Sequence, residues 1–353
     1  MSTASNIEWT DATWNPVTGC TRVSAGCDHC YAVTMTHRLE GMGQAKYAGL
    51  TVLNPRGERH FNGVVRCHED ALEVPLKWKT PRLVFVNSMS DLFHEKVPFE
   101  FIDRVFAVMA LCPRHTFQVL TKRPGRMAEY LAALDVNRIW RCVGKLIGED
   151  AFTKRDAVLP HGSAEESAWW DEGGPLPNVW LGTSVEDQAA ADERIPHLLK
   201  CPAAVRFLSC EPLLGAVNLS AFFGGPYVGL PGDKVHENYN FGIHWVIVGG
   251  ESGKGARPCN VAWELSIVGQ CRAAGVPVFV KQVGARPIGV CPCKADDGDP
   301  HQGCPACGGD GAISLHLHDP KGSNWNEWPE DLRVREFPNP PASAGGSSKA
   351  VRA

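Results

Sequence analysis

Short runs of β-branched and aromatic residues recur six times along the chain, and each run ends in polar or glycine residues. Segments that can form helices follow these runs. Nearly continuous apolar runs alternating with helices predict a parallel sheet whose strands are buried on both faces. We therefore expect an α/β fold, a TIM-like parallel (βα) barrel or a partial barrel. The six runs are RLVFVNSMSD (82–91), TFQVLTKRP (116–124), VWLGTSVED (179–187), VRFLSCEP (205–212), HWVIVGGESG (244–253) and VPVFVKQVG (276–284).

Helical spacing is clearest in two segments between these runs. Residues 98–111 (PFEFIDRVFAVMAL) repeat apolar residues at helical intervals after a proline that suits a first turn. Residues 261–275 do the same and stop at Gly275, which suits the left-handed position after a helix end. Nearer the start, WNPVTG (14–19) predicts a short first strand, and residues 31–43 predict the helix that follows it.

The predicted barrel occupies residues 1–288. Stretches near 140–178 and 221–243 interrupt the strand pattern with sequence rich in glycine and proline, so we expect insertions or lids there. Residues 289–320 form a small cysteine-rich unit, and residues 338–353 have the composition of a disordered tail.

Polar residues follow each predicted strand. In a parallel barrel, the carboxyl ends of the strands and the loops after them carry the active site. Serine and aspartate at such positions also cap helices, whereas glutamates beside a buried edge are costly unless they meet a cation, a donor or a ligand. The candidate catalytic residues are Glu186, Cys210, Glu211, Glu251 and Lys281, and the candidate cofactor-binding residues are Ser88, Ser90, Asp91, Ser184, Gly249 and Gly250.

A basic group, Lys122, Arg123 and Arg126, follows the second of these runs. It is either a solvated helix start or a contact for a phosphate or carboxylate, which suits the fork of an arginine. We expect a nucleotide substrate to be held there if there is one.

Composition narrows the classes further. The chain has 353 residues and a formal net charge of −4, which gives no general attraction for a polyanion. The start shows no basic segment followed by an apolar run, and no stretch approaches the roughly 20 apolar residues that cross a bilayer. We therefore expect a cytoplasmic protein without a membrane partner. In a reducing compartment, the clusters among its 14 cysteines indicate metal binding or catalysis rather than disulfides.

Cys20, Cys27 and Cys30 form the first cluster and are expected in the loop after the first strand. A closed zinc site would need a fourth ligand, for which His29 and His37 are available. An iron–sulfur cluster normally has four cysteines, so three would leave one iron without a thiolate. The residues alone leave both metals open.

Cys291, Cys293, Cys304 and Cys307 form the second cluster among turn residues. Four thiolates complete a tetrahedral site, so a structural zinc knuckle is the leading interpretation. An auxiliary iron–sulfur cluster and unpaired thiols are the alternatives.

The three cysteines in the first loop of a parallel barrel resemble those of the radical S-adenosylmethionine enzymes, and CDHCY (27–31) matches the closing half of their motif. The common pattern has three residues between the first two cysteines, whereas six separate Cys20 from Cys27. The resemblance implies a [4Fe–4S] cluster on Cys20, Cys27 and Cys30, with S-adenosylmethionine bound at the fourth iron. It also implies a 5′-deoxyadenosyl radical that abstracts hydrogen, and a reductant protein as partner.

The same resemblance implies roles for residues of the candidate site. Ser88 to Asp91 lie where these enzymes often place a Gly-Gly-Glu segment, although this chain has SMSD there. Ser184 and Glu186 are candidates for the ribose hydroxyls or the substrate, and Cys210 is a candidate hydrogen donor.

Seven ordered motifs resemble an uncharacterised phage and prophage protein family known for its three-cysteine motif. That family implies no reaction, although a phage-like source suggests a nucleotide or a nucleic-acid base as substrate. The alternatives are a zinc-stabilised module that binds nucleic acid or protein, and a metal-dependent hydrolase on a similar barrel. The motifs are IEWTDATWNPVTGC, NSMSDLFHE, LTKRP, LGTSVE, SCEPLLG, WVIVGGESG and VFVKQVG.

Overall fold

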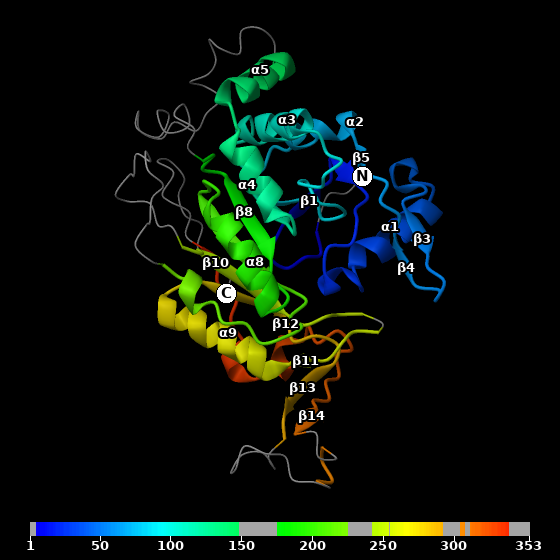
Figure 1. Ribbon diagram of the computed structural model, residues 1–353, viewed down its shortest axis with the longest axis vertical. Helices are drawn as coiled ribbons and strands as arrows, with labels where there is room; N and C mark the ends of the chain where they lie inside the picture. Colours follow the sequence, from blue (N-terminus) through cyan, green and yellow to red (C-terminus); the bar gives the residue numbers. More distant parts are fainter. Residues whose placement is uncertain are drawn as a thin grey trace.

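The centre of the molecule is a seven-stranded parallel sheet that curls into a half-barrel (Figure 1). The computed structural model describes residues 5–147, 175–224, 242–253, 255–291, 304–307 and 311–338. The strands of this sheet follow one another in space in the same order as in the sequence, so each connection leads from one strand to its neighbour. The partial barrel expected from the six apolar runs is confirmed. The strands are, in order, β1 (Ala12–Trp14), β6 (Leu83–Val86), β7 (Thr116–Thr121), β8 (Val179–Ser184), β9 (Val205–Cys210), β10 (Trp245–Gly249) and β12 (Val278–Gln282).

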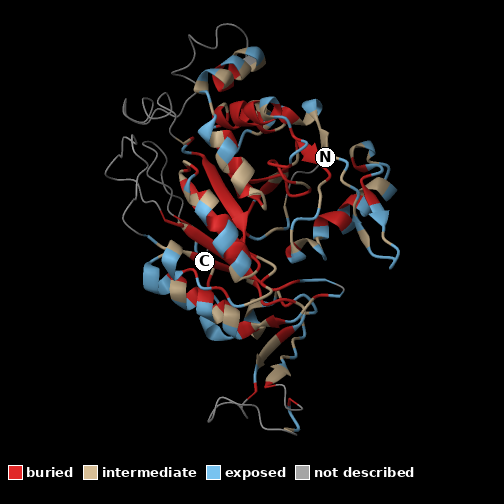
Figure 2. Cartoon of the chain, viewed as in Figure 1, coloured by how far each residue is buried: buried red, intermediate tan, exposed pale blue. Residues whose placement is uncertain are grey.

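Helices follow most of these strands and present exposed outer faces, whereas the sheet is buried (Figure 2). The helices predicted at 98–111 and 261–275 are confirmed, and Gly275 has the expected left-handed conformation, with φ of 66°. Among the described residues, the α-helices are α1 (Tyr31–Gly41), α2 (Glu69–Leu72), α3 (Phe99–Ala110), α4 (Pro124–Ala132), α5 (Val136–Ile147), α8 (Gln188–Leu199) and α9 (Val261–Ala274).

The first strand differs from its prediction at 14–19. β1 ends at Trp14, because the following Pro16 has no N–H to donate to a sheet. Val17–Thr18 instead forms β2, which pairs antiparallel with β5 (Arg66–Cys67). The predicted order of strand, cysteines and helix is nevertheless present.

The two faces of the sheet have different cores, because side chains alternate between faces along a strand. Val84 and Val86 of β6, and the residues of neighbouring strands that face the same side, pack against helix residues; we call this cluster the large core. The concave face carries an aromatic floor of Trp9, Phe85, Trp180, Phe207, Trp245 and Phe279. Trp245 is fully buried at its centre, with ring centroids 5.8 Å from Trp180 and 5.8 Å from Phe207. Trp180, Trp245 and Phe279 lie in the first two positions of their strands, so the floor leaves the carboxyl edge for polar residues.

In the described part of the chain, three small sheets lie outside the half-barrel. One is the β2–β5 pair, and another is a hairpin beside α1. The third is a ribbon that projects from the half-barrel after β12 (Figure 1). Their remaining strands are β3 (Thr51–Leu53) with β4 (Arg59–Phe61), and β11 (Cys259–Asn260) with β13 (Pro287–Val290) and β14 (Ala312–Ser314).

The C-terminal segment covers the outer edge of β12. Val280 donates its N–H to the carbonyl of Val334, and Glu336 donates to that of Val278, both at 2.9 Å. The predicted tail lies outside the described residues from position 339 onward. Most of both predicted insertions does as well, although α5 occupies the start of the first.

Candidate functional site

The first three cysteines lie in the loop that joins β1 to α1 at the carboxyl edge of the sheet; we call residues 15–30 the cysteine loop. All three thiols are half-buried. Burial raises the pKa of Cys20 to about 12, and the nearby Cys30 adds to this shift. Burial also raises the pKa of Cys30, with a contribution from Cys27. The sulfurs are therefore neighbours, yet they do not all lie within 4.8 Å of one another.

Glu186, just after β8, holds the cysteine loop from one side. Its carboxylate accepts hydrogen bonds from Ser24 Oγ at 2.5 Å, Lys122 Nζ at 2.5 Å and Arg194 Nη1 at 2.7 Å. Burial alone would raise the pKa of Glu186, but the charges of Lys122 and Arg194 outweigh it and hold that pKa below its ordinary value. Gly26 passes so close that a Cβ there would lie 2.3 Å from Oε1.

Glu251, just after β10, holds the loop from another side. One carboxylate oxygen lies 2.8 Å from His29 Nδ1, and the carboxylate accepts from the backbone N–H and Nη2 of Arg257 at 2.8 and 2.7 Å. Arg257 also donates to the carbonyl of Ala25 at 2.9 Å. Burial would raise the pKa of Glu251, but hydrogen bonds from Arg257 and His29 hold it below its ordinary value. Glu186 and Glu251 are thus ionised and engaged in positioning the loop.

The end of β6 supports the start of the same loop. Ser90 Oγ donates to the carbonyl of Val17 at 2.8 Å, and Ser88 Oγ lies 3.2 Å from Asn15 Oδ1. Asn87, which precedes them, adopts a left-handed conformation with φ of 58°, a conformation that asparagine tolerates. Ser88 and Ser90 therefore bind the chain itself at these positions.

Asp91 joins the ends of β6 and β7. Its carboxylate accepts from Thr121 Oγ1 at 2.7 Å, from the N–H of Lys122 at 3.1 Å and from Arg123 Nη1 at 3.1 Å. Arg123 in turn donates to Thr21 Oγ1 in the cysteine loop at 2.7 Å. Asp91 thus acts on the loop through Arg123.

A further ion pair lies at the ends of β9 and β12. Lys281 Nζ donates to Glu211 Oε1 at 2.6 Å, and Gln282 Nε2 donates to the same oxygen at 3.2 Å. Tyr31 is 54% exposed as a residue, but its hydroxyl donates to the carbonyl of Ser88 at 2.5 Å. Burial of that hydroxyl raises the pKa of Tyr31, and the charges of Cys30 and Glu211 add to the shift. The hydroxyl of Tyr31 therefore lies near both the cysteine loop and this ion pair.

Cys210 points away from this edge. Alternation along β9 puts Glu211 on the concave side with Phe207, whereas Cys210 is fully buried in the large core behind the sheet. Burial raises the pKa of Cys210 further. The structure therefore places Cys210 among packing residues and does not bring it to the candidate site.

The remaining predicted residues, Ser184, Gly249 and Gly250, take part in packing and hydrogen bonding of the main chain. Ser184 is buried, and its carbonyl accepts from Arg194 at 2.9 Å. A Cβ on Gly249 would lie 3.0 Å from the carbonyl oxygen of Gln282, and one on Gly250 would lie 2.7 Å from that of Val283. The packing of β10 against the end of β12 accounts for both glycines without a ligand.

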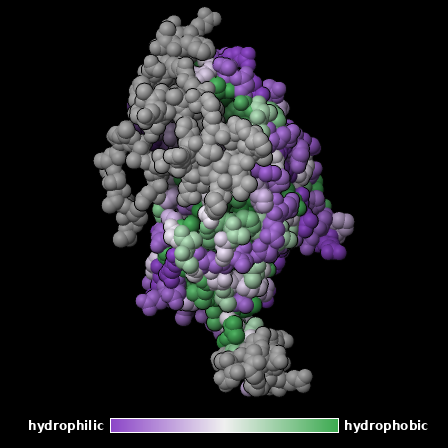
Figure 3. Space-filling view, turned by 60° about the vertical axis from the view of Figure 1, so that its left-hand side comes forward, coloured by the Kyte–Doolittle hydropathy of each residue, from purple (hydrophilic) through white to green (hydrophobic). Residues whose placement is uncertain are grey.

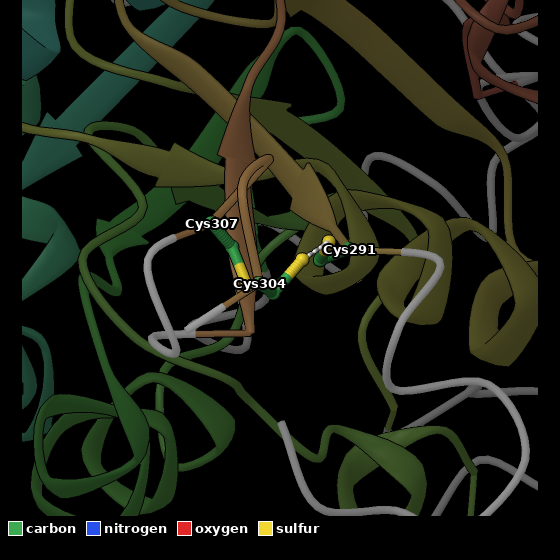
Figure 4. A group of neighbouring side chains, drawn as sticks. All are labelled: Cys291, Cys304 and Cys307. Atoms are coloured by element: carbon green, nitrogen blue, oxygen red, sulfur yellow. Dashed lines mark hydrogen bonds between the residues drawn. The ribbon is translucent and has the colours of Figure 1, made fainter. Parts of the chain in front are cut away.

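Three cysteines of the second cluster converge at the tip of the β13–β14 ribbon (Figure 4). The sulfurs of Cys291, Cys304 and Cys307 all lie within 4.8 Å of one another, and Cys291 and Cys304 are 3.8 Å apart. Cys293 lies outside the described residues. Hydrophobic surface extends onto this ribbon (Figure 3), where Val290 is 55% exposed. The three described thiols form a group that can hold a metal ion.

Ser24, Arg194 and Arg257 were not among the residues expected at the site. Arg194 lies eight positions after Glu186 and Arg257 six after Glu251, but acids and bases at such spacings are common on protein surfaces. Of the two histidines considered as zinc ligands, His29 contacts Glu251, and His37 Nδ1 lies 3.9 Å from Glu40 on its own helix.

No helix in the described part of the chain has the length and apolar character needed to span a membrane. Searches of the curated proteins and of the solved structures gave no significant match. Among protein-family models, residues 4–303 match the one described as "Protein of unknown function (DUF5131)". Since this match covers well over half of its length, the chain belongs to the DUF5131 family.

Proposed function

We propose that the protein is a radical S-adenosylmethionine enzyme in which Cys20, Cys27 and Cys30 hold a [4Fe–4S] cluster. The observation that carries this proposal is the arrangement of three half-buried thiols on a loop that polar side chains hold over the carboxyl edge of a half-barrel. When bound, the cluster and S-adenosylmethionine supply a 5′-deoxyadenosyl radical that abstracts hydrogen from an unactivated carbon.

The spacing of the sulfurs supports a cluster rather than a single ion. A tetrahedral zinc with bonds of about 2.3 Å places its sulfur ligands roughly 3.8 Å apart. Cys291 and Cys304 match that separation, at 3.8 Å. The sulfurs of the first group do not all lie within 4.8 Å of one another, as suits cysteines that each bind a different iron.

Residues of the chain would position, orient and shield the reacting groups. Glu186 and Glu251 fix the cysteine loop, since each is bonded both to that loop and to an arginine. The aromatic floor excludes water from below, which protects a reactive radical from competing donors. Glu211 and Lys281 are 18% and 20% exposed, so they remain open to polar groups of the cofactor or substrate.

We take a nucleotide or a nucleic-acid base as the first substrate class to test, from the resemblance to phage and prophage proteins. Lys122 is 19% exposed beside Glu186, so we propose it as a cation that an anionic substrate contacts. At the second cysteine cluster we propose a structural zinc, with Cys293 as the fourth ligand.

Anaerobic reconstitution with iron and sulfide tests the proposal. The wild-type protein should take up about four irons per chain at the first cluster, show the visible absorbance of an iron–sulfur cluster, and form 5′-deoxyadenosine with dithionite and S-adenosylmethionine. Replacement of Cys20, Cys27 and Cys30 by serine should abolish all three. Cys142→Ser is the matched control, because Cys142 is half-buried on α5 and belongs to neither cluster.

Stoichiometric zinc at the first group without iron uptake would contradict the proposal and favour the zinc-stabilised binding module. Activity with a metal but without S-adenosylmethionine would favour the hydrolase.

A further inference from the structure

Arg123 occupies a constrained place beside the cysteine loop. It follows β7, precedes Pro124 at the start of α4, and keeps only 8% of its side chain exposed. Its backbone N–H donates to Thr121 Oγ1 at 2.9 Å, which helps to set the direction of its side chain. A buried arginine is retained only where its charge and donors are matched.

One side of the guanidinium is anchored by carboxylates that follow β6. Nη1 donates to Asp91 at 3.1 Å, and Nε donates to Glu95 at 3.0 Å. Asp91 is itself held by Thr121 and the N–H of Lys122. Two carboxylates outside the cysteine loop therefore anchor the positive charge.

The other side of the guanidinium meets the cysteine loop. Nη2 donates to Thr21 Oγ1 at 2.7 Å and to the carbonyl of Thr21 at 3.3 Å, while Nη1 approaches Cys20 Sγ at 3.8 Å. Among the described residues, neither Cys27 nor Cys30 has a cationic side chain within hydrogen-bonding distance of its sulfur.

We propose that Arg123 is a positioning residue that fixes Cys20 and raises the reduction potential of the cluster that this cysteine binds. This inference rests on the proposed function. A hydrogen bond to a ligand sulfur and a nearby positive charge both stabilise the more negative, reduced cluster in the step [4Fe–4S]²⁺ + e⁻ → [4Fe–4S]⁺. The electron comes from an external reductant, such as dithionite.

The fork of the guanidinium accounts for arginine at this position. A lysine ammonium is a single point charge and cannot keep Asp91, Glu95, Thr21 and Cys20 in contact at once. Lysine should therefore keep the charge but lose part of the alignment, whereas glutamine should lose the charge altogether.

The test is a redox titration of the reconstituted wild type, R123Q, R123K and R126Q. Arg126 is the matched control, because it lies in the first turn of α4, three positions after Arg123, and donates to the backbone carbonyls of His94 and Val97. At a fixed applied potential, R123Q should show a ratio of reduced to oxidised cluster about tenfold lower than wild type. That ratio corresponds to about 59 mV for a one-electron couple. R123K should fall between them, and R126Q should match wild type.

The outcomes separate the two proposals. A wild type that takes up no iron overturns both. A wild type and R123Q that both bind the cluster and show the same ratio overturn only the role of Arg123. If R123Q takes up no iron, R123K provides the test instead. A ratio of reduced to oxidised cluster in R123K that equals that of the wild type would also overturn the role of Arg123.

Discussion

Gly26 gives the sharpest test of how the cysteine loop is held. In Gly26→Ala, the new Cβ would lie 2.3 Å from Glu186 Oε1 and 2.4 Å from its Cγ, whereas ordinary contacts begin at 3.4 Å. One partner must then move by 1.1 Å, the difference between 3.4 and 2.3 Å. Such a shift is enough to break the 2.5 Å contacts of Glu186 with Ser24 and Lys122.

Overpacking of this kind costs about 1–3 kcal/mol. Unfolding entropy of about 2.1 cal/mol/K per residue over 353 residues gives roughly 0.74 kcal/mol/K, so the melting temperature should fall by about 1–4 °C. We also expect less iron per chain after reconstitution, because the loop loses its contact with β8. Melting followed by circular dichroism and iron analysis measure the two effects.

Gly269→Ala is the control for this substitution. Gly269 is exposed within α9, and a Cβ there meets nothing within 4 Å, so alanine should stabilise the helix by up to about 1 kcal/mol. A Gly26→Ala protein with unchanged melting temperature and iron content would refute the conclusion that Glu186 holds the cysteine loop.

Two further predictions concern groups outside the cysteine loop. Burial raises the pKa of Glu264 from 4.5 to about 8, so between these pH values the folded protein holds a proton that the unfolded chain releases. The free energy of unfolding should therefore fall by at most about 1.4 kcal/mol per pH unit as pH rises through that window. Glu264→Gln should remove this slope in denaturant titrations between about pH 5 and pH 9, and an unchanged slope would assign it to other groups. If the second cluster holds the zinc proposed above, Cys304→Ser should lower the zinc content found by elemental analysis of the reduced protein; full zinc retention would show that Cys304 is not a ligand.

The sheet was predictable because each of its main strands is buried on both faces and therefore reads as an unbroken apolar run. The hairpin of β3 and β4 was not predicted. Its strands have three residues each and pair only with each other, so they are too short to show a period. The segment around Val334 that covers the edge of β12 likewise carries no periodic signal.

The site was predictable in its location but only partly in its roles. Strand ends identified Glu186 and Glu251, yet their partners come from distant segments, and sequence alone does not pair Glu251 with His29. Cys210 was expected at the site because it ends a strand, and that expectation overlooked strand alternation: Phe207 and Cys210 differ by an odd number of positions and face opposite sides.

The contacts that hold the cysteine loop also determine when, during synthesis of the chain, this loop can reach its final conformation. Ser24 and Glu186 are 162 positions apart, His29 and Glu251 are 222 apart, and Ala25 and Arg257 are 232 apart. The cysteines therefore leave the ribosome long before the residues that hold their loop. Contacts so distant in sequence form late in folding. The contacts that hold the loop around the proposed metal centre can thus form only after residues up to Arg257, and with them most of the half-barrel, have been synthesised.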